Sequence, residues 1–114
     1  MTMHFDAHET REPGARERDL FARLPAVLAA ALKAPGWRRH LGDIDPAAIN
    51  SRDALAKLPV LRKSDLSALQ KAEPPFAGFI AGPLSSFGRL FTSPGPIFEP
   101  EAARADRRIR PRAA

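Results

Sequence analysis

Large apolar residues recur with helical spacing between residues 15 and 34. The stripe comprises Leu20, Phe21, Leu24, Val27, Leu28 and Leu32, together with Ala31. This spacing places the apolar side chains along one side of a helix, so we expect that side to be buried. Pro25 interrupts the pattern and costs a helix interior on the order of 3 kcal/mol. The sequence therefore predicts a kink or two consecutive helices here, followed by a stop at Pro35 and Gly36.

A second helical stretch follows that stop, and capping residues set its boundaries. Asp45, directly before a proline, predicts one short turn. Ser51 predicts a cap for a helix over residues 52–58, with Leu55 and Leu58 facing inward. Each cap contributes roughly 1 kcal/mol, which sets a boundary but does not hold so short a helix without packing.

A third helix is predicted over residues 65–72. Ser64 is placed to cap it, and Leu66 and Leu69 are three positions apart and share a face. Two consecutive prolines, at positions 74 and 75, then end the helical half of the chain.

Extended structure is expected only after those prolines. Residues 76–83 contain phenylalanines among glycines and a proline, which predicts a loop with aromatic anchors. Residues 89–92 predict a short strand, residues 93–96 a turn, and residues 97–98 a returning strand. Because two strands alone are marginally stable in water, this hairpin implies further neighbours.

We therefore predict an α+β arrangement, mainly helical at first and closed by a short β-hairpin, within a single domain. Its parts are a flexible lead-in over residues 1–14, a helical region over residues 15–73, a loop and hairpin over residues 74–100, and a disordered basic tail over residues 101–114. The tail is rich in alanine, arginine and proline and cannot supply a core.

The charge of the 114-residue chain is formally +5, and much of it lies in the tail. Residues 101–114 carry five arginines and two acidic residues, which leaves a net charge of +2 to residues 1–100. The tail favours one alternative function, a small basic helical protein that binds nucleic acid or another acidic partner. A second alternative is a helical module that docks its apolar stripe on a partner protein. The sequence contains no RNP-like strand, zinc site or convincing recognition helix, so we consider nucleic-acid binding unfavoured.

Few other functional classes are indicated. The chain has no cysteine, which excludes disulfides and cysteine nucleophiles. It shows no export signal and no apolar run of the roughly 20 residues that cross a bilayer, so we expect a cytoplasmic protein with no membrane contact. His4 and His8 are spaced i, i+4, as two ligands on one helix face would be, but no further ligands accompany them. We interpret both as solvated side chains and expect no metal site.

Three segments, in this order, resemble phenylacetate-CoA ligases and related adenylate-forming, AMP-binding enzymes. Residues 58–66 (LPVLRKSDL) resemble the segment upstream of the family's nucleotide loop. Residues 75–79 (PFAGF) are similar to the loop that follows, and residues 89–100 (RLFTSPGPIFEP) to the strand, phosphate loop and strand. The helical stretch upstream is also similar, so the resemblance covers residues 5–100.

The resemblance implies part of the large amino-terminal domain of an acid–thiol ligase. Such an enzyme uses ATP and Mg²⁺ to convert a carboxylic acid into an acyl-adenylate, and then transfers the acyl group to coenzyme A. Thr92, Ser93 and Gly95 occupy positions of the loop that holds the polyphosphate, which makes them the implied cofactor-binding residues. Pro94 and Pro96 depart from the pattern, because proline has no N–H to donate to a phosphate.

The resemblance stops after Pro100. In the family, the adenine pocket, the metal-binding acidic residue and the domain with the catalytic lysine all lie further along the chain. We therefore interpret the sequence as the first part of an acyl- or aryl-CoA ligase in a truncated or frameshifted reading frame. We expect it to contain no catalytic residue, to bind no cofactor alone and to be inactive, and we expect its exposed hairpin to allow self-association.

Overall fold

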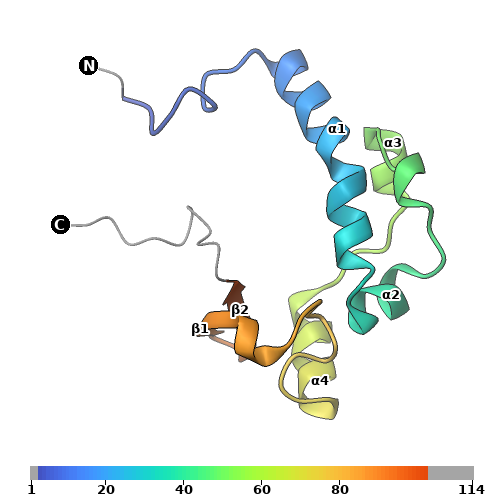
Figure 1. Cartoon of the computed structure of the whole chain (residues 1–114), viewed down its shortest axis with the longest axis vertical. Helices are drawn as coiled ribbons and strands as arrows, with labels where there is room; N and C mark the ends of the chain where they lie inside the picture. The colour runs from blue at the N-terminus through green and yellow to red at the C-terminus, as the bar shows by residue number, and fades with distance from the viewer. Residues whose placement is uncertain (1–2, 103–114) are drawn as a thin grey trace.

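The computed structural model describes residues 3–102, so the predicted tail beyond residue 102 lies outside the described residues. Helices precede a two-stranded antiparallel hairpin (Figure 1), in agreement with the predicted order. The elements are α1 (Pro13–Ala31), α2 (Pro35–Leu41), the 3₁₀ turn η1 (Pro46–Ala48), α3 (Arg52–Ala56), α4 (Lys63–Ala72), the 3₁₀ turn η2 (Leu84–Ser86), β1 (Phe87–Ser93) and β2 (Ile97–Ala102).

Helix α1 begins at Pro13, inside the segment predicted as a flexible lead-in. Glu12 is its N-cap, and the Glu12 carboxylate accepts hydrogen bonds from the N–H groups of Gly14 and Ala15, each at 2.7 Å. Pro13 takes the first helical position, where a missing N–H costs nothing. The Glu-Pro-Gly sequence at the end of the predicted lead-in is therefore a helix start, because an acidic cap accepts the first free N–H groups and proline suits the first helical position.

The Glu12 cap makes the start of α1 sensitive to acid. The hydrogen bonds from Gly14 and Ala15 lower the pKa of Glu12 from its ordinary value, against a smaller opposing effect of desolvation. The pKa of Glu12 is thus lower in the folded chain than in the unfolded chain. The charged carboxylate therefore stabilises the helix start fully when the pH is above the unfolded-state pKa. This stabilisation is lost as the pH falls through the folded-state pKa. We expect the protection of the Gly14 and Ala15 amides, measured by NMR as exchange relative to the intrinsic rate at each pH, to fall at acid pH. In the Glu12→Gln variant this pH dependence should disappear, and its persistence would contradict the cap.

Helix α1 continues without a break through Pro25, so the predicted alternative of two consecutive helices is wrong. Its apolar stripe is also less buried than expected. Only Leu28 is buried, whereas the side chains of Leu20 and Val27 are 50% and 60% exposed. The reason is that η1 packs against one part of α1, and the described residues place nothing over much of the remaining stripe.

Helix α2 was missed in the sequence, where its first two residues were interpreted as a stop. Helix α1 does end just before them, at Ala31, but Pro35 starts a new helix at the position that proline favours. Gly36 lets this helix touch the loop after α4, because its N–H donates to the Gly78 carbonyl at 2.8 Å. A Cβ built on Gly36 would lie 2.6 Å from the Ala77 carbonyl oxygen, so only glycine fits here.

The loop over residues 76–80 packs against α2 through aromatic anchors, as predicted. Phe76 is 5% exposed, and the ring of Phe79 meets Trp37 edge to face at 5.1 Å between centroids. Arg39 on α2 fixes the same loop, since its guanidinium donates to the Ala77 carbonyl at 3.0 Å. Trp37 is therefore half-buried in packing contacts.

Two of the three predicted caps are confirmed. Asp45 accepts from the Ala47 N–H at 3.0 Å and Ser51 accepts from the Ala54 N–H at 3.2 Å. Helix α3 ends at Ala56, two residues early, and Leu55 is 42% exposed rather than facing inward.

The predicted cap of the next helix is wrong. Helix α4 begins at Lys63 with Arg62 at the N-cap position and no side-chain capping bond, so Ser64 lies inside the helix. Leu69 is 42% exposed, whereas Ser67 and Gln70 are buried. The buried side of this helix is therefore polar, which a search for apolar spacing does not detect.

The hairpin is longer than the short strands predicted. Strands β1 and β2 pair from Ser93 opposite Ile97 to Phe87 opposite Ala102, with an irregularity between Phe87 and Arg89. Strand β2 therefore includes Glu101 and Ala102, which the sequence analysis assigned to the tail.

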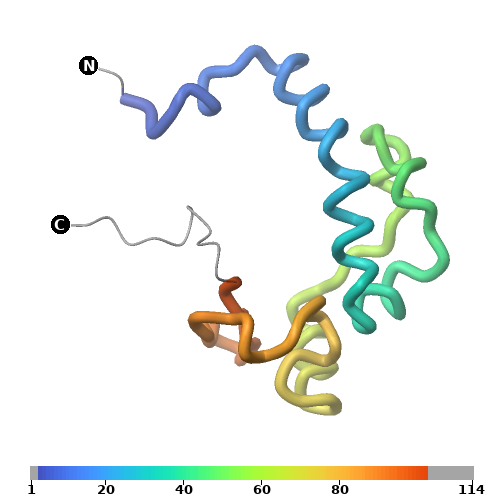
Figure 2. The backbone as a smooth tube through the Cα atoms, in the orientation of Figure 1, coloured from blue at the N-terminus to red at the C-terminus, as the bar shows by residue number. Residues whose placement is uncertain are grey.

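The elements follow one another along an open arc and do not close around a shared centre (Figure 2). The radius of gyration is 16.5 Å, whereas a compact chain of about 100 residues has one of about 13 Å. No large side chain among residues 3–102 is less than 2% exposed, although the small Ala34 is 1% exposed. The described residues thus form local contacts rather than one closed core. None of their helices is both long and apolar enough to cross a membrane.

Candidate functional site

The hairpin turn over residues 92–96 lies against α4, where two polar side chains hold it. Ser67 Oγ donates to the Gly95 carbonyl at 2.9 Å, with the Pro96 carbonyl at 3.4 Å. One helical turn further along α4, Gln70 reaches the backbone of β2. Because Ser67 and Gln70 are both buried, these bonds fix the turn on the helix.

Gln70 pairs with Phe98 as a neighbouring strand would. Its side-chain amide donates to the Phe98 carbonyl at 3.0 Å, and the Phe98 N–H donates to Gln70 Oε1 at 2.8 Å. Both backbone groups of Phe98 therefore point away from β1, so Phe98 and the facing Thr92 form a non-hydrogen-bonded pair. The nitrogen of Pro100 also lies on the side of β2 that faces away from β1. Because proline has no N–H, no unpaired donor is left at this position.

The three predicted phosphate-loop residues are close together at this turn, but they differ in what they can offer a ligand. Thr92 is exposed, whereas the Ser93 hydroxyl is enclosed and has no hydrogen-bond partner among the described residues. Gly95 has a φ of 112°, a conformation that side-chain-bearing residues rarely adopt. The Gly95 carbonyl already accepts a hydrogen bond from Ser67. Because Pro94 and Pro96 have no N–H, the Gly95 N–H is the backbone donor at the centre of the turn.

Lys63 is a further site residue that the sequence analysis missed. Helix α4 places it beside the turn, and a Cβ built on Gly95 would lie 3.5 Å from Cε and 3.8 Å from Nζ of Lys63. The sequence shows no lysine within the loop itself, and Lys63 lies 32 positions before Gly95. Its presence in the LPVLRKSDL motif was the one available signal. The ammonium group supplies the positive charge that a phosphate would need at this turn.

A buried ion pair stabilises the far end of the hairpin. Arg89 donates to both carboxylate oxygens of Glu101, with Nη2 at 3.1 Å from Oε1, and the Glu101 side chain is only 6% exposed. The Arg89 guanidinium also lies 5.6 Å above the centre of the Phe91 ring. Because Arg89 neutralises Glu101 within the hairpin, we regard this pair as structural.

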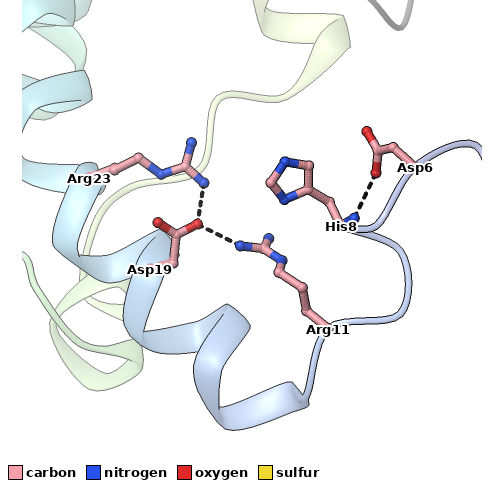
Figure 3. Close-up of polar contacts among 5 residues, drawn as sticks. All are labelled: Asp6, His8, Arg11, Asp19 and Arg23. Atoms are coloured by element: carbon pink, nitrogen blue, oxygen red, sulfur yellow. Dashed lines mark hydrogen bonds and ion pairs between the residues drawn. The ribbon is translucent and has the colours of Figure 1, made fainter.

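The two histidines near the start of the chain each lie beside an acidic residue. Nδ1 of His4 lies 3.4 Å from a Glu9 carboxylate oxygen, and the His8 N–H donates to Asp6 at 2.8 Å, as Figure 3 shows for His8. Over residues 3–102, no three His, Cys, Asp or Glu side chains come together where they could hold a metal ion. The Mg²⁺ that the family resemblance implies thus finds no ligand cluster in this part of the chain.

An arginine-bound carboxylate fixes the first half of α1 next to these histidines. Asp19 accepts hydrogen bonds from Arg11 at 2.7 Å and from Arg23 at 2.6 Å (Figure 3). The bond from Arg11, together with the charge of Arg23, holds the pKa of Asp19 below its ordinary value despite some desolvation. This cluster is a surface network that orders the segment before α1.

An apolar groove with a volume of about 540 Å³ lies between α1 and α3. Exposed Leu20, Val27 and Leu55 contribute to its walls, and Arg52 crosses its rim to pair with Glu17. The groove contains no cluster of nucleophilic or titratable groups suited to catalysis, so we regard it as an uncovered packing surface.

Three solved structures share this fold, all of 2-hydroxyisobutyryl-CoA ligase, and each match covers 86% of the present chain. The ligase in its postadenylation state with 2-HIB-AMP is 26% identical, with a TM-score of 0.70. The complex with R3-HIB-AMP is 24% identical, with a TM-score of 0.71, and an open conformation with 2-HIB-AMP and CoA is 27% identical, with a TM-score of 0.67. No protein-family model and no curated protein matches the sequence.

The fold is thus that of a segment of an adenylate-forming ligase, which confirms the resemblance found in the sequence. More particularly, the solved structures that share it are of a CoA ligase that is named for 2-hydroxyisobutyryl-CoA. The chain spans 23–24% of the length of these proteins. The similarity therefore concerns one part of such an enzyme.

Proposed function

We propose that this chain is the amino-terminal part of a carboxylate–CoA ligase, in which its hairpin turn faces the phosphates of ATP. The observation that carries the proposal is the convergence, on one turn, of Thr92, the Gly95 N–H and the Lys63 ammonium group. A hydroxyl, a backbone donor and a positive charge are the groups that hold a polyphosphate. The structural similarity to ligases bound to acyl-AMP compounds supports the same assignment.

The turn binds phosphate weakly in this proposal, because it offers few donors. Pro94 and Pro96 lack N–H groups, and the Ser93 hydroxyl is enclosed. The carboxylic acid, ATP, Mg²⁺ and coenzyme A would be bound mainly by other parts of the ligase, so we expect the isolated chain to be inactive. The open arc and the exposed apolar groove support this reading, since both call for further polypeptide to cover them.

The alternative of nucleic-acid binding has less support. It depends on the arginines of residues 103–114, which lie outside the described residues. A salt titration would detect it, since binding through several phosphate contacts weakens steeply as salt rises.

A chimeric enzyme tests the proposal. The matched segment of 2-hydroxyisobutyryl-CoA ligase is replaced by this chain, and acid-dependent ATP–pyrophosphate exchange is measured. We expect exchange above that of a control chimera whose residues 89–98 are scrambled, and no exchange by the isolated chain. Lys63→Ala should raise the KM for ATP about tenfold, the effect of losing one charged hydrogen bond.

Two further chimeras sharpen the result. Pro94→Gly should increase exchange by restoring a donor, whereas Lys71→Ala, on an exposed part of α4, should have no effect. Exchange no higher than that of the scrambled control would refute the ligase assignment. Robust exchange by the isolated chain would refute the expectation that it is inactive.

A further inference from the structure

We propose that Ser67 is a positioning residue for the phosphates of ATP, because its buried hydroxyl holds Gly95 in the orientation that presents the Gly95 N–H beside Lys63. The inference rests on the proposed function and names the residue that sets the geometry of the same site. Ser67 does not touch the ligand in this proposal, since its hydroxyl bonds to the turn from the side of α4. It acts through Gly95.

Gly95 is the residue of the turn whose conformation needs support from outside the hairpin. The rings of Pro94 and Pro96 fix φ at about −65° on either side of it. Gly95 itself has a φ of 112° and no Cβ to limit its rotation, so its peptide groups can turn unless a contact fixes one of them. A Gly95 that is already fixed before ATP arrives binds the phosphate at a smaller cost in conformational entropy.

Ser67 supplies this contact. Its Oγ donates to the Gly95 carbonyl at 2.9 Å, with the Pro96 carbonyl at 3.4 Å. Ser67 is only 8% exposed, so little water competes for the hydroxyl. Rotation of the Gly95 carbonyl away from α4 would break this hydrogen bond. The bond therefore keeps Gly95, and with it the Gly95 N–H, in one orientation.

The spacing of polar residues on α4 fixes the turn relative to the positive charge of the site. Lys63, Ser67 and Gln70 are spaced i, i+4 and i+7, so they share one side of the helix. This side faces the hairpin, and α4 packs against β2 (Figure 1). Lys63 lies beside Gly95, one helical turn before the serine that bonds to the Gly95 carbonyl. The Ser67 bond therefore also sets how the Gly95 N–H lies relative to the Lys63 ammonium group.

The place of the Ser67 bond distinguishes it from a contact that only stabilises the fold. Gln70 holds the strand at Phe98, whereas Ser67 holds the residue that carries the donor itself. Gly95 is exposed, so water can hydrogen-bond to its carbonyl when the serine hydroxyl is removed. Loss of the hydroxyl should therefore loosen the turn without unfolding the hairpin.

The mobility of the Gly95 amide in the absence of ligand tests the first step. It is measured by ¹⁵N relaxation on the full 114-residue chain. We expect an order parameter of about 0.85 in the parent, the value of rigid backbone, and one below about 0.6 in Ser67→Ala. Ser64→Ala makes the same chemical change at an exposed position of α4 and should leave Gly95 rigid. Equal order parameters in the parent and in Ser67→Ala would overturn the proposal.

Kinetics of the chimeric ligase test the second step. Ser67→Ala should raise the KM for ATP about fivefold, the effect of losing one hydrogen bond that positions the donor. The exchange rate at saturating ATP should change less than about twofold, since the turn holds ATP equally in the ground state and the transition state. Ser64→Ala should alter neither constant. An unchanged KM in Ser67→Ala, or an equal rise in Ser64→Ala, would contradict the positioning role.

A cysteine variant guards against misfolding. If circular dichroism shows that Ser67→Ala is unfolded, Ser67→Cys decides the question, because it keeps a side chain of similar size that donates only weakly. A folded Ser67→Cys chimera with a raised KM for ATP would support the proposal, and one with the parent KM would overturn it.

Failure of this inference can be told apart from failure of the proposed function. A parent chimera whose exchange is no higher than that of the scrambled control refutes the ligase assignment, and with it any role of Ser67 toward ATP. An active parent chimera in which Ser67→Ala keeps the parent KM refutes the positioning role alone.

Discussion

Replacement of Gly36 by alanine is expected to destabilise the chain by about 2–3 kcal/mol, the cost of forcing atoms into a filled space. The new Cβ would meet backbone atoms of the loop after α4, 2.6 Å from the Ala77 carbonyl oxygen and 2.8 Å from the Gly78 carbonyl carbon. Neither can move without breaking the bond from the Gly36 N–H to Gly78. Since small domains are stable by only about 5–15 kcal/mol, and this one has an open core, the loss is a large fraction of the stability available.

Urea denaturation followed by circular dichroism measures this effect, and Gly88→Ala is its control. A Cβ at Gly88 meets nothing within 4 Å, so the same chemical change should alter the unfolding free energy by less than about 0.5 kcal/mol. If Gly36→Ala is as stable as Gly88→Ala, the contact between α2 and the loop does not contribute to the fold.

Replacement of Gln70 by alanine is expected to release the hairpin from α4 at a cost of about 1–3 kcal/mol, the price of leaving buried donors and acceptors unpaired. The change removes two hydrogen bonds to Phe98. Amide exchange at Phe98 should accelerate at least about tenfold, because its N–H loses its acceptor, whereas exchange at Gly36, which donates to Gly78, should change little.

Two variants separate polarity from shape. Gln70→Met keeps most of the side-chain volume without the amide, and should behave like alanine if the hydrogen bonds dominate. Lys71→Ala alters the exposed neighbour and should leave both stability and Phe98 exchange unchanged. Protection of the Phe98 amide in Gln70→Ala equal to that in the parent would show that α4 does not hold the strand.

Local signals in the sequence predicted much of the chain's structure. The caps at Asp45 and Ser51 and the turn between the strands depend on neighbouring residues, and they lie where expected. Helix α2 was missed because proline and glycine usually end helices, although proline is equally suited to the first helical position. The burial of α1 was overestimated, because a spacing pattern shows which side of a helix is apolar but not what covers it.

The site was predictable only in part for a related reason. Thr92, Ser93 and Gly95 adjoin in sequence, so a motif could place them together. Lys63 and Gln70 join them only because α4 lies against the hairpin, 28 or more positions earlier in the chain. Tertiary packing of this kind leaves no periodic signal, and the polar buried side of α4 looks like a solvated one until its partners are known.

The contact between Trp37 and Phe79 gives the chain a built-in optical reporter. Trp37 is the single tryptophan and there is no tyrosine, so ultraviolet emission arises wholly from α2, against which the 76–80 loop rests. The hairpin contains no such fluorophore. Separation of the loop from α2 should therefore change the tryptophan emission, whereas unfolding of the strands should not. A comparison of fluorescence with amide exchange in the strands would show whether the two ends of the arc unfold together or one after the other.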